Sequence, residues 1–290
     1  MAAKSETISP TAHATGYLWY RLGLSDARLT TPQGQRLDRA FRLLGRATQL
    51  LGGVSLDALM EARHRGIDAR LTRAIDEGRV TQVIELAAGL SPRGWRYKRR
   101  YGAKLTYIET DLPAMAAEKR RLLEQAGGMK PGHKVVELDV LKRGGPHSLA
   151  GIAKTLDPNK GVAIITEGLM NYLAPDAAAD LWRRIARTLG GFPQGLYLAD
   201  FYLLEEQRRA PAMALFGGVL QLFVRGRMHV HFKNQAAALE GLRRYGLRDA
   251  TLYRAGDLPE TAALGQIRGG DRVRVLEVRK TGDAPRKKSR

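Results

Sequence analysis

The sequence of 290 residues contains no cysteine. Structural disulfides, zinc or iron–sulfur sites with cysteine ligands, and a thiol nucleophile are therefore excluded. The absence of disulfides is typical of proteins from a reducing compartment, and we expect a cytoplasmic location. We also expect no bound metal.

The sequence also lacks long apolar runs. The longest uncharged stretch, PAMALFGGVLQLFV at 211–224, is too short to cross a bilayer, which takes about 20 residues. The N-terminus, MAAKSETISPTAHATGY, has no basic start followed by an apolar stretch, so we expect neither a signal peptide nor a membrane span. Because 44% of the residues are hydrophobic, the chain can still bury a sizeable core.

Acidic residues are in the minority. Lys and Arg number 48 against 29 Asp and Glu, which gives a net charge of +19 and favours anionic partners. The basic residues gather in PRGWRYKRRYGAK (92–104) and in PRKKSR (285–290). These stretches are either a solvated face and a disordered tail or a nucleic-acid surface. The second interpretation draws on Trp95, Tyr97 and Tyr101, because aromatics between basic residues favour stacking on bases.

The hydrophobic pattern predicts one domain over residues 16–280. Its first part carries apolar residues at spacings of three and four, which is typical of helices. The predicted segments are a disordered N-terminus (1–15), a helical lid (16–78), a core sheet in two parts (79–202 and 234–280), a cap insertion between those parts (203–233) and a basic, disordered tail (281–290).

Apolar segments rich in β-formers alternate with helical patterns after residue 78. This alternation predicts a parallel, doubly wound α/β sheet, whose ligands bind at the carboxyl ends of the strands. A later pair, LRDATLYRA (247–255) and DRVRVLEVRK (271–280), predicts an antiparallel edge with a half-exposed last strand. The five strands predicted before that pair span 80–88, 104–111, 133–140, 161–168 and 195–202.

The turn after the first predicted strand is small. In VIELAAGLSPRG (83–94), Ala87 and Gly89 meet the size requirement of a loop whose backbone approaches a cofactor. The full G-x-G-x-x-G fingerprint is absent, which weakens an NAD interpretation, and an ordinary strand–turn remains the alternative. Glu85, at the end of the strand, is placed to orient the loop or to meet an amine.

Acidic side chains close the next strands. Glu109 and Asp111 end the second strand about 20 residues after the loop, where a carboxylate accepts from the hydroxyls of a ribose. The alternative for this pair is a helix-cap acid. Asp139 is placed to accept from an adenine amino group or to cap a turn. Glu167 closes the apolar fourth strand, where a charged residue favours a functional role over a place in the core.

Four segments together carry a resemblance to a known family. VIELAAGL, YIETDLPAMAAEKRRLL, the Leu-Asp pair at 138–139 and IITEGLMNYLAPD resemble the leucine carboxyl methyltransferase family, in order and spacing from about residue 60 to 200. That family belongs to the class I methyltransferases that use S-adenosylmethionine and includes polyketide-type O-methyltransferases. The resemblance implies a Rossmann-like, seven-stranded sheet with an N-terminal helical segment and a cap.

The resemblance also implies roles in binding S-adenosylmethionine. Arg63 matches the family arginine that pairs with the cofactor's carboxylate, a task that suits its planar fork; the alternative is a solvated helix residue. Ala87 departs from the family, which usually has glycine there. The other implied roles are the methionine end for Gly89, the ribose for Asp111 with Glu109 as the fallback, the adenine for Asp139 and Val140, and the methionine amine for Glu167.

The acceptor side offers three catalytic candidates. A carboxylate acceptor needs no base, whereas an alcohol or phenol does. Histidine in general titrates near neutral pH, and alternation places His229 and His231 on one face of an extended stretch. Surface or packed histidines are the alternative. Tyr202 begins the cap insertion, and Arg225 and Arg227 are candidates to hold an acidic acceptor.

The sequence therefore predicts an S-adenosylmethionine-dependent O-methyltransferase for a carboxylate or hydroxyl of an acidic or aromatic small molecule. Tyr17, Trp19 and Tyr20 are candidates for a lid over that acceptor. One alternative is a protein C-terminal carboxyl methyltransferase with an open cleft. The other is an RNA-binding protein that uses the basic surface. The acidic-proline-aromatic signature of amino-group methylation is missing, since TEGL stands after the fourth strand.

Overall fold

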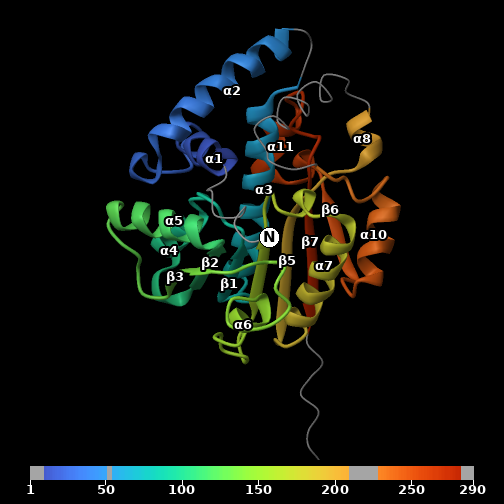
Figure 1. Ribbon diagram of the computed structural model, residues 1–290. Helices are drawn as coiled ribbons and strands as arrows, with labels where there is room; N and C mark the ends of the chain where they lie inside the picture. Colours follow the sequence, from blue (N-terminus) through green and yellow to red (C-terminus); the bar gives the residue numbers. More distant parts are fainter. Residues whose placement is uncertain (1–9, 51–53, 209–227, 282–290) are drawn as a thin grey trace, which may run out of the picture.

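The computed structural model describes residues 10–50, 54–208 and 228–281, which form a seven-stranded sheet in the order β3-β2-β1-β4-β5-β7-β6 (Figure 1). The first five strands run parallel, and β7 is antiparallel to both β5 and β6. The strands are β1 (Gln82–Leu86), β2 (Thr106–Asp111), β3 (His133–Glu137), β4 (Val162–Thr166), β5 (Gln194–Phe201), β6 (Asp249–Tyr253) and β7 (Arg274–Thr281).

Helices connect the parallel strands, because a parallel crossover has to return to the same end of the sheet. From β1 the chain builds β2 and β3 on one side and then crosses to β4 on the other, so the strand order reverses between β1 and β4. Such a reversal opens a ligand crevice at the carboxyl ends of the strands. The connecting helices are α4 (Arg93–Tyr101), α5 (Pro113–Gln125), α6 (Leu149–Ala153) and α7 (Pro175–Leu189).

Both faces of the sheet are covered by apolar side chains. On one face, Ile67 and Leu71 of α3 (Leu56–Asp76) pack with Tyr97 of α4. On the other face, Trp182 of α7 packs with Leu242 of α10 (Gln235–Arg244). Every residue of β1 and β4 is buried, as expected for parallel strands between two helical layers. The continuous apolar runs that predicted these strands follow from this double cover.

The N-terminal segment is helical, with α1 (Pro10–Arg21) and α2 (Pro32–Leu50) above the sheet in Figure 1. The expectation of disorder over 1–15 is wrong for residues 10–15, which belong to α1. Proline suits the first position of this helix, and the buried Leu18 and Trp19 pack against Met60 of α3. Tertiary packing therefore holds a helix whose own apolar pattern is weak.

The antiparallel pair β6 and β7 forms as predicted, but the half-exposed character of β7 is wrong. β7 lies between β5 and β6, and Val275 to Val278 are buried because helices cover both sides of the strand. Val275 packs with α3, while Leu276 and Val278 pack in the cluster around α7. The buried Glu277 accepts a hydrogen bond from Arg70 of α3. The edge strand is β6.

The predicted cap insertion is described at its two ends. α8 (Leu204–Arg208) follows β5, and Leu203 forms a parallel bridge with Phe232. Arg225, Arg227 and the apolar stretch 211–224 lie outside the described residues, as does the predicted basic tail. Among the helices of the described ranges, none is long and apolar enough to cross a membrane.

Candidate active site

The loop after β1 has a left-handed backbone. Ala87 and Gly89 have φ angles of +50° and +51°, and Ala87 is the one non-glycine residue with a positive φ in the described part of the chain. An L-residue in this conformation is strained by roughly 1–2 kcal/mol. The structure thus explains why glycine is usual at this position of the family. It also shows that alanine adopts the same turn. Strained backbone of this kind is found at functional sites, where the surrounding structure holds it in place.

Asp111 lies at the carboxyl end of β2 and faces this loop. Its Oδ2 accepts a hydrogen bond from the Gly89 amide at 2.7 Å, and its Oδ1 accepts from the Leu112 amide at 2.8 Å. Burial raises the pKa of Asp111, although the two amide donors oppose the shift. Each carboxylate oxygen has a second lone pair. The side chain is therefore held against the loop with acceptor capacity to spare.

Glu109 does not share this position, which corrects its fallback role at the ribose. The side chain is fully buried two residues deeper in β2, where its oxygens lie 2.6 Å from Lys119 Nζ and 2.9 Å from His133 Nε2. Lys119 of α5 and the histidine at the start of β3 thus neutralise it inside the fold. Asp111 alone of this pair reaches the loop after β1.

Glu85 is also closed off, which corrects its expected contact with an amine. Its carboxylate is 1% exposed, accepting from Arg93 Nη1 at 2.5 Å and from the Tyr107 hydroxyl at 2.6 Å. Arg93 lies in the first turn of α4, directly after the loop. Glu85 at the end of β1 therefore orients α4, the helix after the loop, through Arg93.

Arg93 is a fully buried hub that the sequence reasoning missed. Besides Glu85, its Nε donates to Asp68 Oδ1 at 2.6 Å and its Nη2 donates to Glu167 Oε2 at 2.5 Å. One guanidinium therefore joins α3, β1, α4 and the end of β4 through charge-assisted hydrogen bonds. The sequence carries one signal for this hub. His64 and Asp68 lie one helical turn apart on α3, and Arg93 and Arg96 lie about one turn apart on α4, so each helix can present its pair to the other.

The basic stretch 92–104 is not a uniformly solvated face. Lys98 is 2% exposed and donates to the carbonyls of Gly102 and Leu105. Tyr97 is buried in the core, and Arg99 stacks over Trp95 with 4.7 Å from Cζ to the ring centroid. The aromatics between the basic residues therefore do not form an open stacking platform. This removes the observation that favoured RNA binding.

Glu167 follows β4 and is bound by three partners. Arg63 Nε donates to its Oε1 at 3.0 Å, and His64 Nδ1 and Arg93 Nη2 contact its Oε2. Burial would raise the pKa of Glu167, but the neighbouring His64, Arg93 and Arg63 hold it well below the usual range. The carboxylate is thus ionised and fixed at the strand end.

His64 is fully buried between these groups. Arg96 Nη1 lies 3.1 Å from its Nε2. Glu167 Oε2 and Arg93 Nη2 each lie 3.0 Å from its Nδ1. Trp19 stacks on the imidazole with ring centroids 4.3 Å apart. This buried tryptophan packs within the fold, which corrects its expected place in an acceptor lid.

Arg63 sits among acids rather than in solvent, which excludes the solvated-helix alternative. Its side chain is 12% exposed, and Nη1 lies 3.5 Å from Asp200 Oδ2. Asp200, near the end of β5, also accepts from the Gly168 amide at 2.7 Å. It is a second residue that the sequence reasoning missed, although an acid in an apolar strand was the signal used for Glu167.

Tyr202 lies against Arg63, and burial raises its pKa above the usual range despite the arginine. The phenol therefore stays protonated at neutral pH. A protonated phenol donates or accepts a hydrogen bond but does not take a proton as a general base. The structure thus brings the candidate Tyr202 to the site as a protonated phenol.

The two candidate histidines lie side by side, as the alternation predicted. Their rings are 6.3 Å apart and 19° from parallel. The His229 amide donates to the Asn171 carbonyl, and His231 Nε2 lies 2.8 Å from the Met170 carbonyl. Both histidines are thereby tied to the turn after Glu167. Burial lowers the pKa of His231, whose ring packs edge-on against Trp182.

Asp139 and Val140 follow β3, and the Leu138 amide joins this segment to the Asp111 carbonyl at 2.8 Å. Asp139 Oδ1 accepts from the Leu141 amide at 2.9 Å, which is the turn-capping geometry left open as an alternative. Val140 packs against the core, and its carbonyl accepts from Arg184. The segment is placed beside Asp111 but is half-exposed.

One edge of the sheet thus carries an acid against a tight loop, an ionised acid, a buried guanidinium and a second buried acid. This set can bind a diol, a cation and a carboxylate side by side. In the described ranges, no group of three or more His, Asp or Glu side chains is arranged to hold a metal.

Comparison with known proteins gives the same family that the sequence resembles. The model of the family "Leucine carboxyl methyltransferase" matches residues 28–186. A protein of Frankia alni named "Putative S-adenosyl-L-methionine-dependent methyltransferase" is 34% identical over 165 residues, which cover 55% of this chain and 56% of that protein. One of Mycobacterium leprae with the same description is 34% identical over 139 residues, covering 46% of this chain and 44% of its own length. The chain spans about half the length of these curated relatives.

Solved structures show the same fold at low identity. A DUF574 family protein from Streptomyces avermitilis superposes with a TM-score of 0.61 at 15% identity, covering 94% of this chain and 97% of that one. A "putative methyltransferase" from Thermobifida fusca gives 0.59 at 14% identity, covering 97% of both chains. The predicted class I α/β sheet is confirmed by these likenesses. Because the family model matches more than half of the residues, this chain belongs to the leucine carboxyl methyltransferase family, whose members use S-adenosylmethionine.

Proposed function

We propose that this chain binds S-adenosylmethionine at the carboxyl ends of β1, β2 and β4 and transfers its methyl group to an oxygen of a small molecule. The observation that carries the proposal is the convergence of Asp111, the loop at Gly89 and the Glu167–Arg63 pair at one sheet edge. Each of these groups complements one part of the cofactor, and the family match points to the same cofactor.

The residues fit the cofactor by the chemistry of their donors and acceptors. Asp111 is placed to accept from the ribose hydroxyls, with the small turn at Ala87 and Gly89 leaving the backbone accessible. Glu167 suits the methionine ammonium, and Arg63 suits the carboxylate. An added Cβ at Gly168 would lie 3.3 Å from Arg63, so glycine keeps room around that guanidinium.

When bound, S-adenosylmethionine supplies an activated methyl group, and the protein's task is to hold the acceptor oxygen in line with it. Buried side chains around Arg63 exclude water from this edge. Of the three catalytic candidates, Tyr202 stays protonated and His231 is bound to a carbonyl. Since a carboxylate acceptor needs no base, these constraints favour carboxyl methylation; for a hydroxyl acceptor, His229 is the candidate base.

A second candidate function is methylation of a protein C-terminal carboxylate, which the family's name favours. The chemistry at the oxygen is the same, and the acceptor differs in size. We favour the small molecule because the edge around Glu167 is lined by buried side chains.

The test begins with calorimetric titration of the protein with S-adenosylmethionine and S-adenosylhomocysteine, with NAD as control. Micromolar binding of the first two and none of NAD is expected. Methyl transfer from radiolabelled cofactor is then measured with aromatic and aliphatic carboxylic acids, phenols and a peptide ending in leucine. A carboxyl ester releases labelled methanol in base, whereas an ether does not. Failure to bind either sulfur compound contradicts the proposal.

A further inference from the structure

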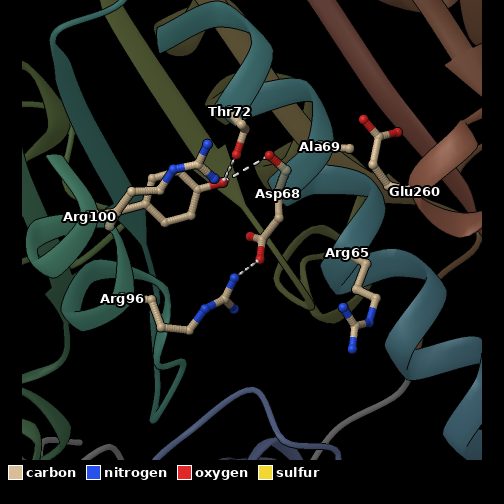
Figure 2. Close-up of a pocket in the computed structure, with 8 residues that line it drawn as sticks. Arg65, Asp68, Ala69, Thr72, Arg96, Arg100 and Glu260 are labelled. Atoms are coloured by element: carbon tan, nitrogen blue, oxygen red, sulfur yellow. Dashed lines mark hydrogen bonds and ion pairs between the residues drawn. The ribbon is translucent and has the colours of Figure 1, made fainter. Parts of the chain in front are cut away.

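A hollow lies between α3 and α4, and Figure 2 draws the residues that line it. Its volume is about 380 Å³. That volume is within the range of small-molecule sites. Its lining contains none of the residues proposed to bind S-adenosylmethionine. The residues that matter for its chemistry are three arginines, two acids and one tyrosine: Arg65, Arg96, Arg100, Asp68, Glu260 and Tyr97.

The charge of the lining favours an anion. The lining contains three guanidinium groups and two carboxylates, and the whole chain has a net charge of +19. The side chains of Arg65 and Arg100 are 41% and 58% exposed, and they pair with Glu61 at 2.6 Å and Asp76 at 3.5 Å. Exposed ion pairs contribute little to stability, so a bound anion can recruit both arginines from these partners.

The floor of the hollow is preformed. The Tyr97 hydroxyl donates to the Asp68 carbonyl at 2.8 Å, and its oxygen lies 2.8 Å from Thr72 Oγ1 (Figure 2). Since the tyrosine is buried in the core, its ring cannot move into the hollow. Ligand binding therefore requires rearrangement of exposed arginines and not of the floor.

Asp68 connects this hollow to the proposed cofactor site. Its Oδ2 accepts from Arg96 Nη2 at 2.5 Å in the hollow, and its Oδ1 accepts from Arg93 Nε at 2.6 Å beneath it. Arg93 in turn donates to Glu167, which Arg63 holds from the other side. Five groups of alternating charge thus run without a break from the wall of the hollow to the carboxyl end of β4.

We propose that the α3–α4 hollow is a second site, for a small molecule that carries a carboxylate or phosphate group, and that its occupation strengthens binding of the cofactor. An anion that engages Arg96 weakens its hold on Asp68, which then binds Arg93 more strongly. Arg93 is thereby drawn from Glu167, whose carboxylate becomes more available to the ammonium of the cofactor. The effect is reciprocal, as linkage requires.

The first experiment measures anion binding directly, by calorimetry at constant ionic strength, with inorganic pyrophosphate as the phosphate probe and citrate as the carboxylate probe. The double variant Arg65→Gln, Arg100→Gln is expected to weaken binding of the preferred probe at least tenfold. Arg187→Gln, an exposed arginine on α7, is the matched control and is expected to change nothing. Absence of binding, or equal losses in both variants, overturns the site.

The second experiment measures coupling, and it rests on the proposed function. Saturating probe is expected to lower the Kd of S-adenosylhomocysteine about fivefold, the lower end of usual coupling. Asp68→Asn is expected to abolish the effect, and Arg96→Gln is an alternative should that variant fold poorly. An unchanged Kd overturns the coupling. A raised Kd overturns it as well, because the probe and S-adenosylhomocysteine would then compete for one site. If the wild type binds no S-adenosylhomocysteine, the proposed function fails, while the anion titration remains interpretable.

Discussion

Replacement of Arg93 by lysine tests the reasoning about the buried hub most directly. The arginine is fully buried and gives hydrogen bonds of 2.5–2.6 Å to Asp68, Glu85 and Glu167. Lysine keeps the positive charge but has a single nitrogen on a flexible stem, which cannot reach three carboxylates from different elements.

The magnitude follows from the contacts. Hydrogen bonds to charged groups contribute about 1.5–3 kcal/mol each, and loss of two of the three would remove about 3–6 kcal/mol. Some of this loss is recovered, because a protonated or rehydrated carboxyl group relaxes, so we expect destabilisation of about 2–4 kcal/mol.

The assay is urea unfolding followed by circular dichroism. Arg187→Lys, on the exposed side of α7, is the control and should stay within about 0.5 kcal/mol of the wild type. If Arg93→Lys were as stable as this control, the hub would carry no net energy and the account given for it would be refuted.

Three further changes test individual features. Ala87→Gly should retain cofactor binding and raise the free energy of unfolding in urea by about 0 to 1 kcal/mol, because relief of the positive φ is partly offset by the entropy of glycine in the unfolded chain. A loss of affinity for the cofactor would contradict this. Asp111→Ala should weaken binding of S-adenosylhomocysteine by about 1–3 kcal/mol in calorimetry, with the exposed Asp176→Ala as control. The pKa of Glu167 is lowered in the folded state from a usual value of 4.5, so its stabilising effect is present above that pH and is lost as the pH falls. The stability difference between wild type and Glu167→Gln should therefore be largest above pH 5 and shrink in acid, and a pH-independent difference would speak against it.

Much of the sheet could be predicted from the sequence, because β1, β4 and β5 are buried on both faces and read as apolar runs. The position of β7 could not, since its alternating pattern is that of an exposed edge and only the packing of α3 and α7 on its two sides buries it. The start of helix α1, residues 10–15, was missed for the same reason: the contacts that stabilise this helix come from α3, far along the chain.

The candidate site divides in a similar way. Asp111 and Glu167 were identified because each closes a strand, and strand ends meet at one edge. Glu109 shares a face with Asp111 by alternation, but it lies two residues deeper, under helices that only the fold reveals. Arg93 was taken for part of a basic stretch, because nothing local indicates that carboxylates from α3, β1 and the end of β4 converge on it.

The interior place of β7 governs the order in which the protein can assemble during synthesis. Until residues 274–281 leave the ribosome, β5 presents an unpaired edge and β6 has no neighbour. Arg70 of α3 is synthesised some 200 residues earlier and lacks its partner Glu277 until then. The nascent chain thus carries an open strand and an unmatched buried charge, both hazards for association with other chains. Completion of the sheet is therefore a late, cooperative step, in which β7 pairs with β5 and β6 and Glu277 meets Arg70.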